Sequence, residues 1–189
     1  VYAFHNLPGM EVGSFATRSG TITASESLFN IKLWGQGGHS ALPHMGVDTI
    51  TVGTQIITSL QSIVSRKLNP AMNGVVSVTK FESDGNENIL PGHSIISGDA
   101  RALSPEANKI IEDSMRNIVE GIANAHGIKF EFTYDTRTNM TINTTDQAAF
   151  ASKVAEDLVG TDNVDGNCDP KLFSEDFAQM LMVKPGCYI

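Results

Sequence analysis

A histidine in a glycine-rich segment is the feature of this sequence best suited to chemistry. Residues 34–44 read Trp-Gly-Gln-Gly-Gly-His-Ser-Ala-Leu-Pro-His, with His39 after three glycines. Glycine has no Cβ, so such a segment lets the backbone approach a ligand closely. It follows a strand-like stretch and precedes a helix-like one, which predicts a loop that presents the imidazole of His39. Such a group can stabilise an oxyanion, although a loop histidine bonded to its own turn is locally the commoner case.

A second histidine, His5, ends the apolar segment at residues 1–5 and precedes Asn6-Leu7-Pro8. In α/β proteins the groups at the carboxyl end of a strand face the functional crevice. A neutral imidazole there is a good ligand for Zn, Mn or Co. His5 is therefore a candidate metal ligand, with a structural histidine bonded to a backbone carbonyl as the open alternative.

Three further polar residues complete the candidate set. Asn88 lies before Ile-Leu-Pro, and Arg101 ends a strand-like segment. An amide and a guanidinium can together hold a carboxylate, with arginine binding it through two hydrogen bonds; the alternative for Arg101 is a surface cation. Glu175 is a candidate for a supporting role behind a metal ligand, or it serves with Asp176 only to favour a helix N-terminus.

Composition excludes several classes of protein. The 189 residues are 41% hydrophobic and 18% charged, which is typical of a globular chain. Thirteen basic and 21 acidic residues give a net charge of −8, which argues against nucleic acid or an anionic membrane as a partner. No apolar run approaches the roughly 20 residues that span a bilayer. Cys168 and Cys187 form no CxxC motif, which favours free thiols in a reducing compartment.

Hydrophobic periodicity predicts one well-defined module. Residues 26–34 alternate as in a half-buried strand, and residues 47–68 carry apolar rows at helical spacing. Gly98 is expected to mark a bulge or a close approach of two chain segments. The predicted order is β-α-β-β-α-β, the ferredoxin-like pattern of two helices on one face of a four-stranded antiparallel sheet. The further predicted elements are strands at 75–81, 94–102 and 128–134 and a helix at 104–126.

The segments outside this module are shorter. A buried strand is expected at residues 1–5, and a helix over 145–160 with an apolar row of Phe150, Val154 and Leu158. A short helix is expected after Ser174. The simplest organisation is a lid or dimerisation domain at 24–138 inserted in a partial second domain made of 1–23 and 139–189.

In chain order, these signals resemble the M20 metallopeptidases, and among them the aminoacylase-like amidohydrolases of the hippurate and indoleacetyl-amino-acid hydrolase type. The resemblance covers nearly the whole chain, and its most specific piece is the glycine–histidine segment with its Pro-His tail. The other matching pieces are Phe4–Pro8, Arg18–Gly20, Thr23–Ser25, Gly46–Asp48, Leu60–Arg66, Asn88–Pro91, Gly98–Arg101, Glu175–Ala178 and Pro185-Gly186.

The resemblance implies a zinc-peptidase-like catalytic domain with the ferredoxin-like lid inserted, a homodimer formed through the lid, and two divalent metal ions. His5 matches a metal ligand, and His39 matches the lid histidine that reaches the active site, in dimeric members that of the neighbouring subunit. Asn88 and Arg101 match positions for the substrate carboxylate. The implied reaction is hydrolysis of the amide of an N-acyl amino acid or small peptide, with a glutamate as general base.

The departures from the family pattern are equally informative. The upstream His-x-Cys-Gly-His-Asp segment, the Glu-Glu pair with the general base, and a C-terminal metal histidine are absent from residues 1–189. Only His5 remains of the expected metal ligands. We therefore expect a fragment of an M20-type amidohydrolase, inactive alone and holding no metal by itself. The N-terminus is expected to be truncated, so a signal peptide cannot be assessed, and the expected location is cytoplasmic.

Two other hypotheses are weighed against this one. A non-enzymatic dimerisation or regulatory module with the lid fold predicts a stable dimer without hydrolysis, even when the missing segments are restored. A ferredoxin-like RNA-binding domain would need a basic face and exposed aromatic residues on its middle strands. The net charge of −8 argues against the RNA-binding alternative.

Overall fold

The computed structural model describes all residues, 1–189, and its chain folds as two compact units. Unit 1 consists of Val1–Glu26, Ala102–Ser104 and Arg137–Ile189. Unit 2 consists of Ser27–Arg101 and Pro105–Thr136. The roles of catalytic domain and lid remain predictions. No helix in either unit combines the length and the apolar character needed to cross a membrane.

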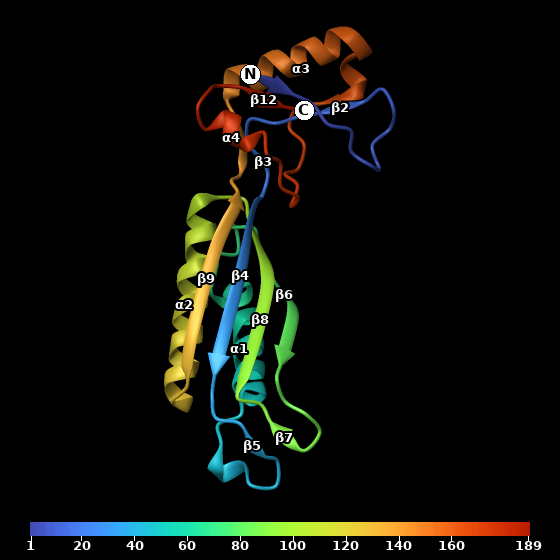
Figure 1. Ribbon diagram of the computed structural model, residues 1–189. Coiled ribbons are helices and arrows are strands. Elements are labelled where there is room, and N and C mark those ends of the chain that lie inside the picture. The colour runs from blue at the N-terminus through green and yellow to red at the C-terminus, as the bar shows by residue number, and fades with distance from the viewer. The chain divides into compact units, whose positions relative to one another are not determined.

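Unit 2 is built on a four-stranded sheet in the order β6-β8-β4-β9. Helices α1 and α2 both lie against one face of this sheet (Figure 1). The predicted mixed α/β fold is therefore confirmed, and its main strands and helices follow one another in the predicted order. The strands are β4 (Ser25–Trp34), β6 (Gly74–Ser83), β8 (His93–Ala102) and β9 (Lys129–Thr138), and the helices are α1 (Thr49–Ser62) and α2 (Pro105–His126).

The alternating pattern of β4 explains its position in the middle of the sheet. Phe29, Ile31 and Leu33 point to the same face, since side chains alternate along a strand, and all three are almost completely buried. In α2, residues three or four apart, including Ile111 and Met115, form the buried stripe that covers this face. The helix ends at Gly127, whose positive φ of 66° suits a C-terminal glycine.

Helix α1 differs from its prediction on one side. Of the two apolar rows in residues 47–68, the row of Ile56, Leu60 and Ile63 is completely buried. In the other row Ile50 and Val64 are each 41% exposed. One helix face can meet the sheet at a time, so the second row is left toward the outside. The helix continues in a π-helical turn, η2 (Ile63–Lys67).

Gly98 in β8 marks a close approach, as its sequence context predicts. A Cβ at this position would lie 2.0 Å from the carbonyl oxygen of Ser77 and 2.4 Å from Cζ of Phe29. No side chain larger than hydrogen fits there without moving the neighbouring strand or the core. The glycine therefore fixes how tightly the sheet and its core pack.

Beyond one end of the sheet, unit 2 carries a small projection that we call the tip, residues 35–47 and 84–92 (Figure 1). It contains β5 (Gly38–His39), β7 (Ile89–Leu90) and the 3-10 turn η1 (Pro43–Met45). Cβ atoms at Gly35 and Gly37 would lie 2.2 Å from Val47 O and 2.8 Å from Leu90 O. Gly35 and Gly37 allow close approach of the chain's own backbone, whereas a Cβ at Gly38 would meet nothing within 4 Å.

Apart from helix α3, unit 1 consists of short elements. Its strands pair only two by two: β1 with β12 and β2 with β11 in parallel, and β3 with β10 antiparallel. The elements are β1 (Tyr2–Ala3), β2 (Phe15–Ala16), β3 (Gly20–Thr23), β10 (Thr141–Asn143), α3 (Thr145–Val159), η3 (Thr161–Asn163), β11 (Val164–Asp165), α4 (Ala178–Leu181) and β12 (Cys187–Tyr188).

One sequence prediction for unit 1 is wrong, and the helix predicted over 145–160 is confirmed as α3 with its larger apolar row on the outer side. The predicted buried strand at 1–5 is only two residues long, and Phe4 is 84% exposed. In α3 the row of Phe150, Val154 and Leu158 is 50–74% exposed, whereas Ala148, Ala151 and Ala155 face inward. Small alanines let the helix approach the strands of unit 1 closely, and the larger row is left on the outer side.

Buried polar side chains connect the short strands of unit 1. The side-chain amide of Asn143 donates to the carbonyls of Arg18 (2.9 Å) and Tyr188 (3.0 Å), and its oxygen accepts from the Tyr188 N–H (2.8 Å). The hydroxyl of Thr17 donates to the same Tyr188 carbonyl (2.9 Å). Backbone groups that no sheet pairs are thereby satisfied.

Candidate functional site

Unit 1 contains a cavity of about 1110 Å³ whose wall includes His5, Asp165, Cys168 and Tyr188. Strand pairing positions His5 there: its backbone N–H donates to the carbonyl of Ile189 (3.0 Å), which continues the ladder between β1 and β12. Two segments from opposite ends of the chain thus form one wall of the cavity.

The ring of His5 is in a tautomer suited to metal binding. Its Nδ1 lies 2.7 Å from the carbonyl oxygen of Asn6. Because a carbonyl can only accept, Nδ1 carries a proton in this contact, and in the neutral ring Nε2 then keeps its lone pair. A backbone carbonyl on the far nitrogen is a common way to orient a metal-ligating histidine. His5 therefore makes the hydrogen bond to a backbone carbonyl that is expected of a purely structural histidine. The same hydrogen bond leaves Nε2 able to bind a cation.

Glu175 lies close to this wall and is tied to it by Tyr188. The Tyr188 hydroxyl donates to one carboxylate oxygen of Glu175 (2.8 Å), and the backbone N–H of Phe177 donates to the other (3.3 Å). Burial acts to raise the pKa of Glu175, but these hydrogen bonds and the neighbouring His5 outweigh it and lower the pKa. Burial and the adjacent carboxylate raise the pKa of Tyr188. The pair is therefore an ionised carboxylate bound to a neutral phenol.

Other groups of the cavity do not add up to a metal centre or a nucleophile. The chain has no group of three or more His, Cys, Asp or Glu residues arranged to hold a metal ion. Cys168 and Cys187 are free and buried, and burial raises the pKa of both thiols. A raised thiol pKa disfavours the reactive thiolate. Within the chain, His5 is the candidate metal ligand that the geometry supports.

The tip of unit 2 presents His39 in a defined tautomer. His39 pairs with Ile89 across β5 and β7. The backbone N–H of Ala41 donates to Nδ1 of His39 (3.1 Å), so the ring proton resides on Nε2. The ring is exposed. His39 therefore offers a hydrogen-bond donor to a group outside the tip. Its contact with Ala41 is also the bond within the turn that is expected of a purely structural loop histidine.

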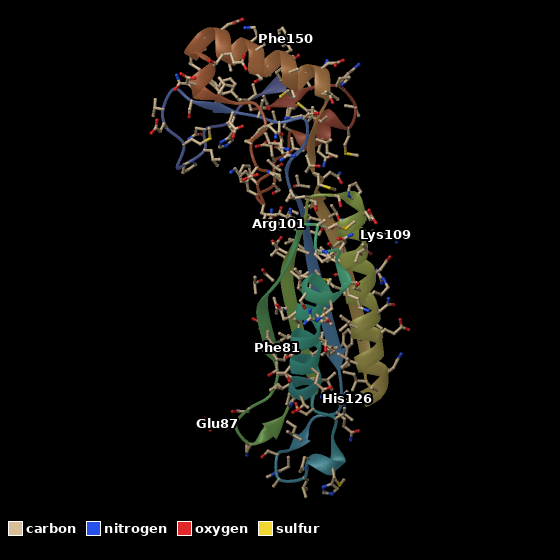
Figure 2. All side chains as sticks on the ribbon, turned by 180° about the vertical axis from the view of Figure 1, so that it is seen from behind. Phe81, Glu87, Arg101, Lys109, His126 and Phe150 are labelled. Atoms are coloured by element: carbon tan, nitrogen blue, oxygen red, sulfur yellow. The ribbon has the colours of Figure 1, made fainter.

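Asn88 is next to His39, whereas Arg101 is far from both. The backbone N–H of Ser40 donates to the Asn88 carbonyl (3.0 Å), and Asn88 lies in a tight turn closed between Asn86 and Ile89. Arg101 is near the other end of β8, where its Nε donates to Asp99 (2.7 Å). Figure 2 shows Arg101 and Glu87, a neighbour of Asn88 in the same turn, at opposite ends of unit 2. One chain does not bring Asn88 and Arg101 together on one carboxylate.

Two residues that sequence reasoning missed take part in these arrangements. Asp99 precedes Arg101 by two positions, so both side chains point to the same face of β8, a relation that strand periodicity alone could have revealed. One carboxylate oxygen of Asp99 is buried and without a hydrogen-bond partner. Tyr188 lies in a two-residue strand near the end of the chain, and no sequence signal connects it with Glu175.

Comparison with known proteins defines the class first. Residues 28–127 match a family model of M20 peptidases described as a peptidase dimerisation domain. The chain is 34% identical over 188 residues to the hippurate hydrolase of Campylobacter jejuni, covering 100% of this chain and 49% of that protein. It is 32% identical over 189 residues to the N-acetyldiaminopimelate deacetylase of Exiguobacterium sibiricum, covering 98% and 49%.

Solved structures agree with these relatives. The Bacillus subtilis YXEP protein, described as a dinuclear metal binding peptidase from the M20 family, superposes with a TM-score of 0.79 at 26% identity. The match covers 99% of this chain and 46% of that one. The chain belongs to the M20 peptidase family. It spans about half the length of the curated relatives that it matches.

Proposed function

We propose that this chain forms part of a metal-dependent amidohydrolase that cleaves the amide bond of N-acyl amino acids. The observation that carries the proposal is the similarity to a hippurate hydrolase and a deacetylase along nearly the whole chain. Because the chain covers about half of each relative, the activity belongs to a longer polypeptide rather than to residues 1–189 alone. Zn, Mn and Co are the candidate metals.

His5 is the proposed metal ligand of this chain. Its Nε2 lone pair is available because Nδ1 donates to Asn6, and an imidazole nitrogen suits all three metals. A divalent ion bound there would lower the pKa of a water molecule and polarise the amide carbonyl. The remaining ligands and the general base would come from outside residues 1–189. Glu175, held by Tyr188, would stabilise the site electrostatically through its negative charge.

His39, Asn88 and Arg101 are the proposed substrate-contacting residues. His39 Nε2–H would donate to the amide oxygen as it becomes an oxyanion. Asn88 and Arg101 would bind the carboxylate of the amino acid, and Asp99 leaves the guanidinium in a fixed orientation for this. Strand β8 rises over eight residue steps from His93, which follows the tip, to Arg101, a length of about 27 Å. A substrate of one amino acid cannot bridge this distance, so the proposal requires two subunits.

The surface proposed for the homodimer is β6 with α1. Both outer strands of the sheet have unpaired edges, and a free edge can pair with another copy. Helix α2 and the edge strand β9 are rich in charged residues, whereas α1 has none and β6 has none before Lys80. Gly53 of α1 packs on Phe81 of β6, so the two elements form one continuous side. Interfaces are depleted of charge at their centre.

A two-fold axis between the β6 strands of two subunits would bring Arg101 of one subunit toward His39 and Asn88 of the other, although these residues are far apart within one chain. Antiparallel pairing of identical edges reverses the second sheet. The tip of one subunit then lies toward the Arg101 end of its partner. His39 and Asn88 from one subunit would thus complete the substrate site that contains Arg101 in the other.

The activity test uses a polypeptide extended at both ends to the length of the relatives. With Mn or Zn it should hydrolyse N-acyl amino acids, and a chelator should abolish the reaction. A stable dimer that binds no metal and hydrolyses none of these substrates would instead favour the non-enzymatic module. His5→Ala should reduce metal content, measured by elemental analysis, which separates a lost ligand from a lost contact with substrate.

Mixed dimers test the shared site. His39→Ala and Arg101→Ala homodimers should each lose activity. After unfolding and refolding together, about a quarter of the sites should be intact, because half of the dimers are mixed and each mixed dimer has one intact site. Recovery of about a quarter of the activity supports the shared site. No recovery, with mixed dimers verified by mass spectrometry, would refute it.

A charge placed on the proposed interface tests the surface itself. Thr54→Lys with Thr58→Lys puts two cations on the exposed side of α1, so the dimer should dissociate to monomers in light scattering. The matched control is Asn117→Lys on the exposed side of α2, where the dimer should persist. Dissociation by the control alone would assign the interface to α2.

A further inference from the structure

Three large apolar side chains that are open to solvent belong to the same tip as His39, one of them directly across the ladder from it. Leu42, Met45 and Ile89 are 50%, 64% and 49% exposed. Residues 35–47 contain no Asp, Glu, Lys or Arg. Residues 35–47 therefore place no fixed charge beside the outward hydrogen-bond donor of His39, and the acidic residues of the tip, Asp84 and Glu87, lie in the segment that carries Ile89.

Backbone hydrogen bonds fix the positions of these residues in the chain relative to the histidine. His39 and Ile89 are directly opposite on β5 and β7, and residues directly opposite point to the same face of a two-stranded ladder. The N–H of Leu42 donates to the His39 carbonyl (2.9 Å), and the N–H of Met45 donates to the Leu42 carbonyl (3.0 Å). A group bonded to Nε2 of His39 therefore lies next to an apolar surface that does not depend on flexible loop placement.

The size of this surface distinguishes among its possible occupants. A stable protein interface uses about 20–30 residues on each side, and three side chains are far below that. A small-molecule site combines a mainly apolar wall with a few placed polar groups. An acyl group has this combination, because its carbonyl oxygen accepts one hydrogen bond and its hydrocarbon part has no other polar atom.

We infer that Leu42, Met45 and Ile89 form the contact surface for the acyl group, and that the enzyme prefers bulky apolar acyl groups over acetyl. This inference rests on the proposed function, in which His39 donates to the amide carbonyl. The three side chains then determine specificity, while His39 serves every substrate alike. Acetyl is too short to cover all three, so its hydrolysis depends on them little.

The test compares N-octanoyl and N-acetyl derivatives of the same amino acids as substrates of the extended polypeptide. The unmutated protein should have a kcat/KM at least about tenfold higher for the octanoyl compounds, since each methylene in an apolar site is worth about tenfold or more. Ile89→Ala and Met45→Ala should each lower kcat/KM for octanoyl substrates about tenfold. For acetyl substrates both variants should stay within about twofold. Val183→Ala, which truncates a side chain that is 75% exposed in unit 1, is the control and should change neither.

The outcomes separate this inference from the function on which it rests. If the unmutated protein hydrolyses neither class, the proposed function fails and this inference falls with it. If it hydrolyses both classes but the variants lose activity on both equally, the function stands and the assignment of the acyl surface is wrong. Because Met45 lies in an exposed turn, Met45→Ala tests the assignment even if Ile89→Ala fails to fold.

Discussion

The two units hold their chain segments together by different means. Unit 2 has a four-stranded sheet with two helices on one face, and at its centre large apolar side chains such as Phe29, Ile56 and Met115 are almost completely buried. Unit 1 has only pairs of short strands and two small apolar clusters. There the side chains of Thr17 and Asn143 bond to backbone groups of other segments.

This difference shows in which unit the apolar residues of the present chain find packing partners. In unit 2 the apolar row of each main element meets a partner, apart from one row of α1. In unit 1 the larger row of α3 meets only Tyr2, through the ring of Phe150, and the strand ladders stop after two or three residue pairs. The chain spans about half of its relatives, so the comparison agrees with a unit 1 that is continued by further polypeptide. Substitutions in each unit can test this contrast.

The largest effect is expected in the apolar core of unit 2. Gly98→Val adds a side chain whose Cβ would lie only 2.0 Å from Ser77 O, and the ring of Phe29 would also have to move. We expect a loss of about 3 kcal/mol in the free energy of unfolding, measured by urea denaturation with circular dichroism. The matched control is Gly121→Ala in α2, where a Cβ meets nothing within 4 Å. That change should stabilise by about 0.5–1 kcal/mol. Equal losses for both would contradict the close packing at Gly98.

In unit 1 the position to be tested is a buried polar side chain, that of Asn143. Asn143→Ala removes the partner of the buried Tyr188 N–H and of the Arg18 carbonyl, at a cost of about 2–3 kcal/mol, while the Tyr188 carbonyl keeps the Thr17 hydroxyl. Amide hydrogen exchange should show the Tyr188 N–H losing its protection while the amides of β8 keep theirs. Asn163→Ala, which removes an exposed hydrogen bond to Val159 O, should change stability by less than about 0.5 kcal/mol. Unchanged protection of Tyr188 in Asn143→Ala would show that unit 1 does not depend on this residue.

The same contrast explains which parts of the fold the sequence reveals. The main elements of unit 2 follow from periodicity because strand alternation and helical rows coincide with burial, as at Ile31 and Ile111. In α3 periodicity misleads, because Phe150 and Leu158 form a regular row that this chain does not bury. A periodic row reveals a helix, and only the partner element reveals which side is covered.

The candidate site is predictable only in part, for a related reason. His5 and His39 can be identified by type and context, but their tautomers depend on single contacts with Asn6 and Ala41. The hydrogen bond between Tyr188 and Glu175 joins segments that no local pattern relates. The separation of Arg101 from His39 follows from strand length, once the tip is known to lie beyond the other end of the sheet.

A moderate effect is expected at the Tyr188–Glu175 pair. Tyr188→Phe keeps the ring and removes the hydrogen bond, so stability at neutral pH should fall by about 1 kcal/mol. The folded pKa of Glu175 is lowered from its ordinary value of 4.5. Its stabilising contribution is therefore complete above that value and is lost as the pH falls through the folded pKa.

The pH dependence provides the check on this pair. The stability difference between the unmutated chain and Tyr188→Phe should shrink below about pH 4, as the carboxylate is protonated in both proteins. In a Glu175→Gln background, Tyr188→Phe should cost less and show no such pH dependence. A difference that is constant from pH 7 to pH 3 would show that the Tyr188 hydroxyl contributes independently of the charge of Glu175.

The smallest effect on stability is expected on the outer side of α3, and it bears most directly on whether unit 1 is incomplete. Val154→Gln with Leu158→Gln replaces two side chains that are 50% and 74% exposed, so the free energy of unfolding should change by less than about 0.5 kcal/mol. Self-association in light scattering should decrease, because an exposed apolar row is removed. Ala155→Gln on the buried side is the control and should destabilise by about 2 kcal/mol. In the extended polypeptide the same double change should instead cost stability, because further chain would cover the row; an unchanged stability there would mean that α3 faces solvent in the whole protein.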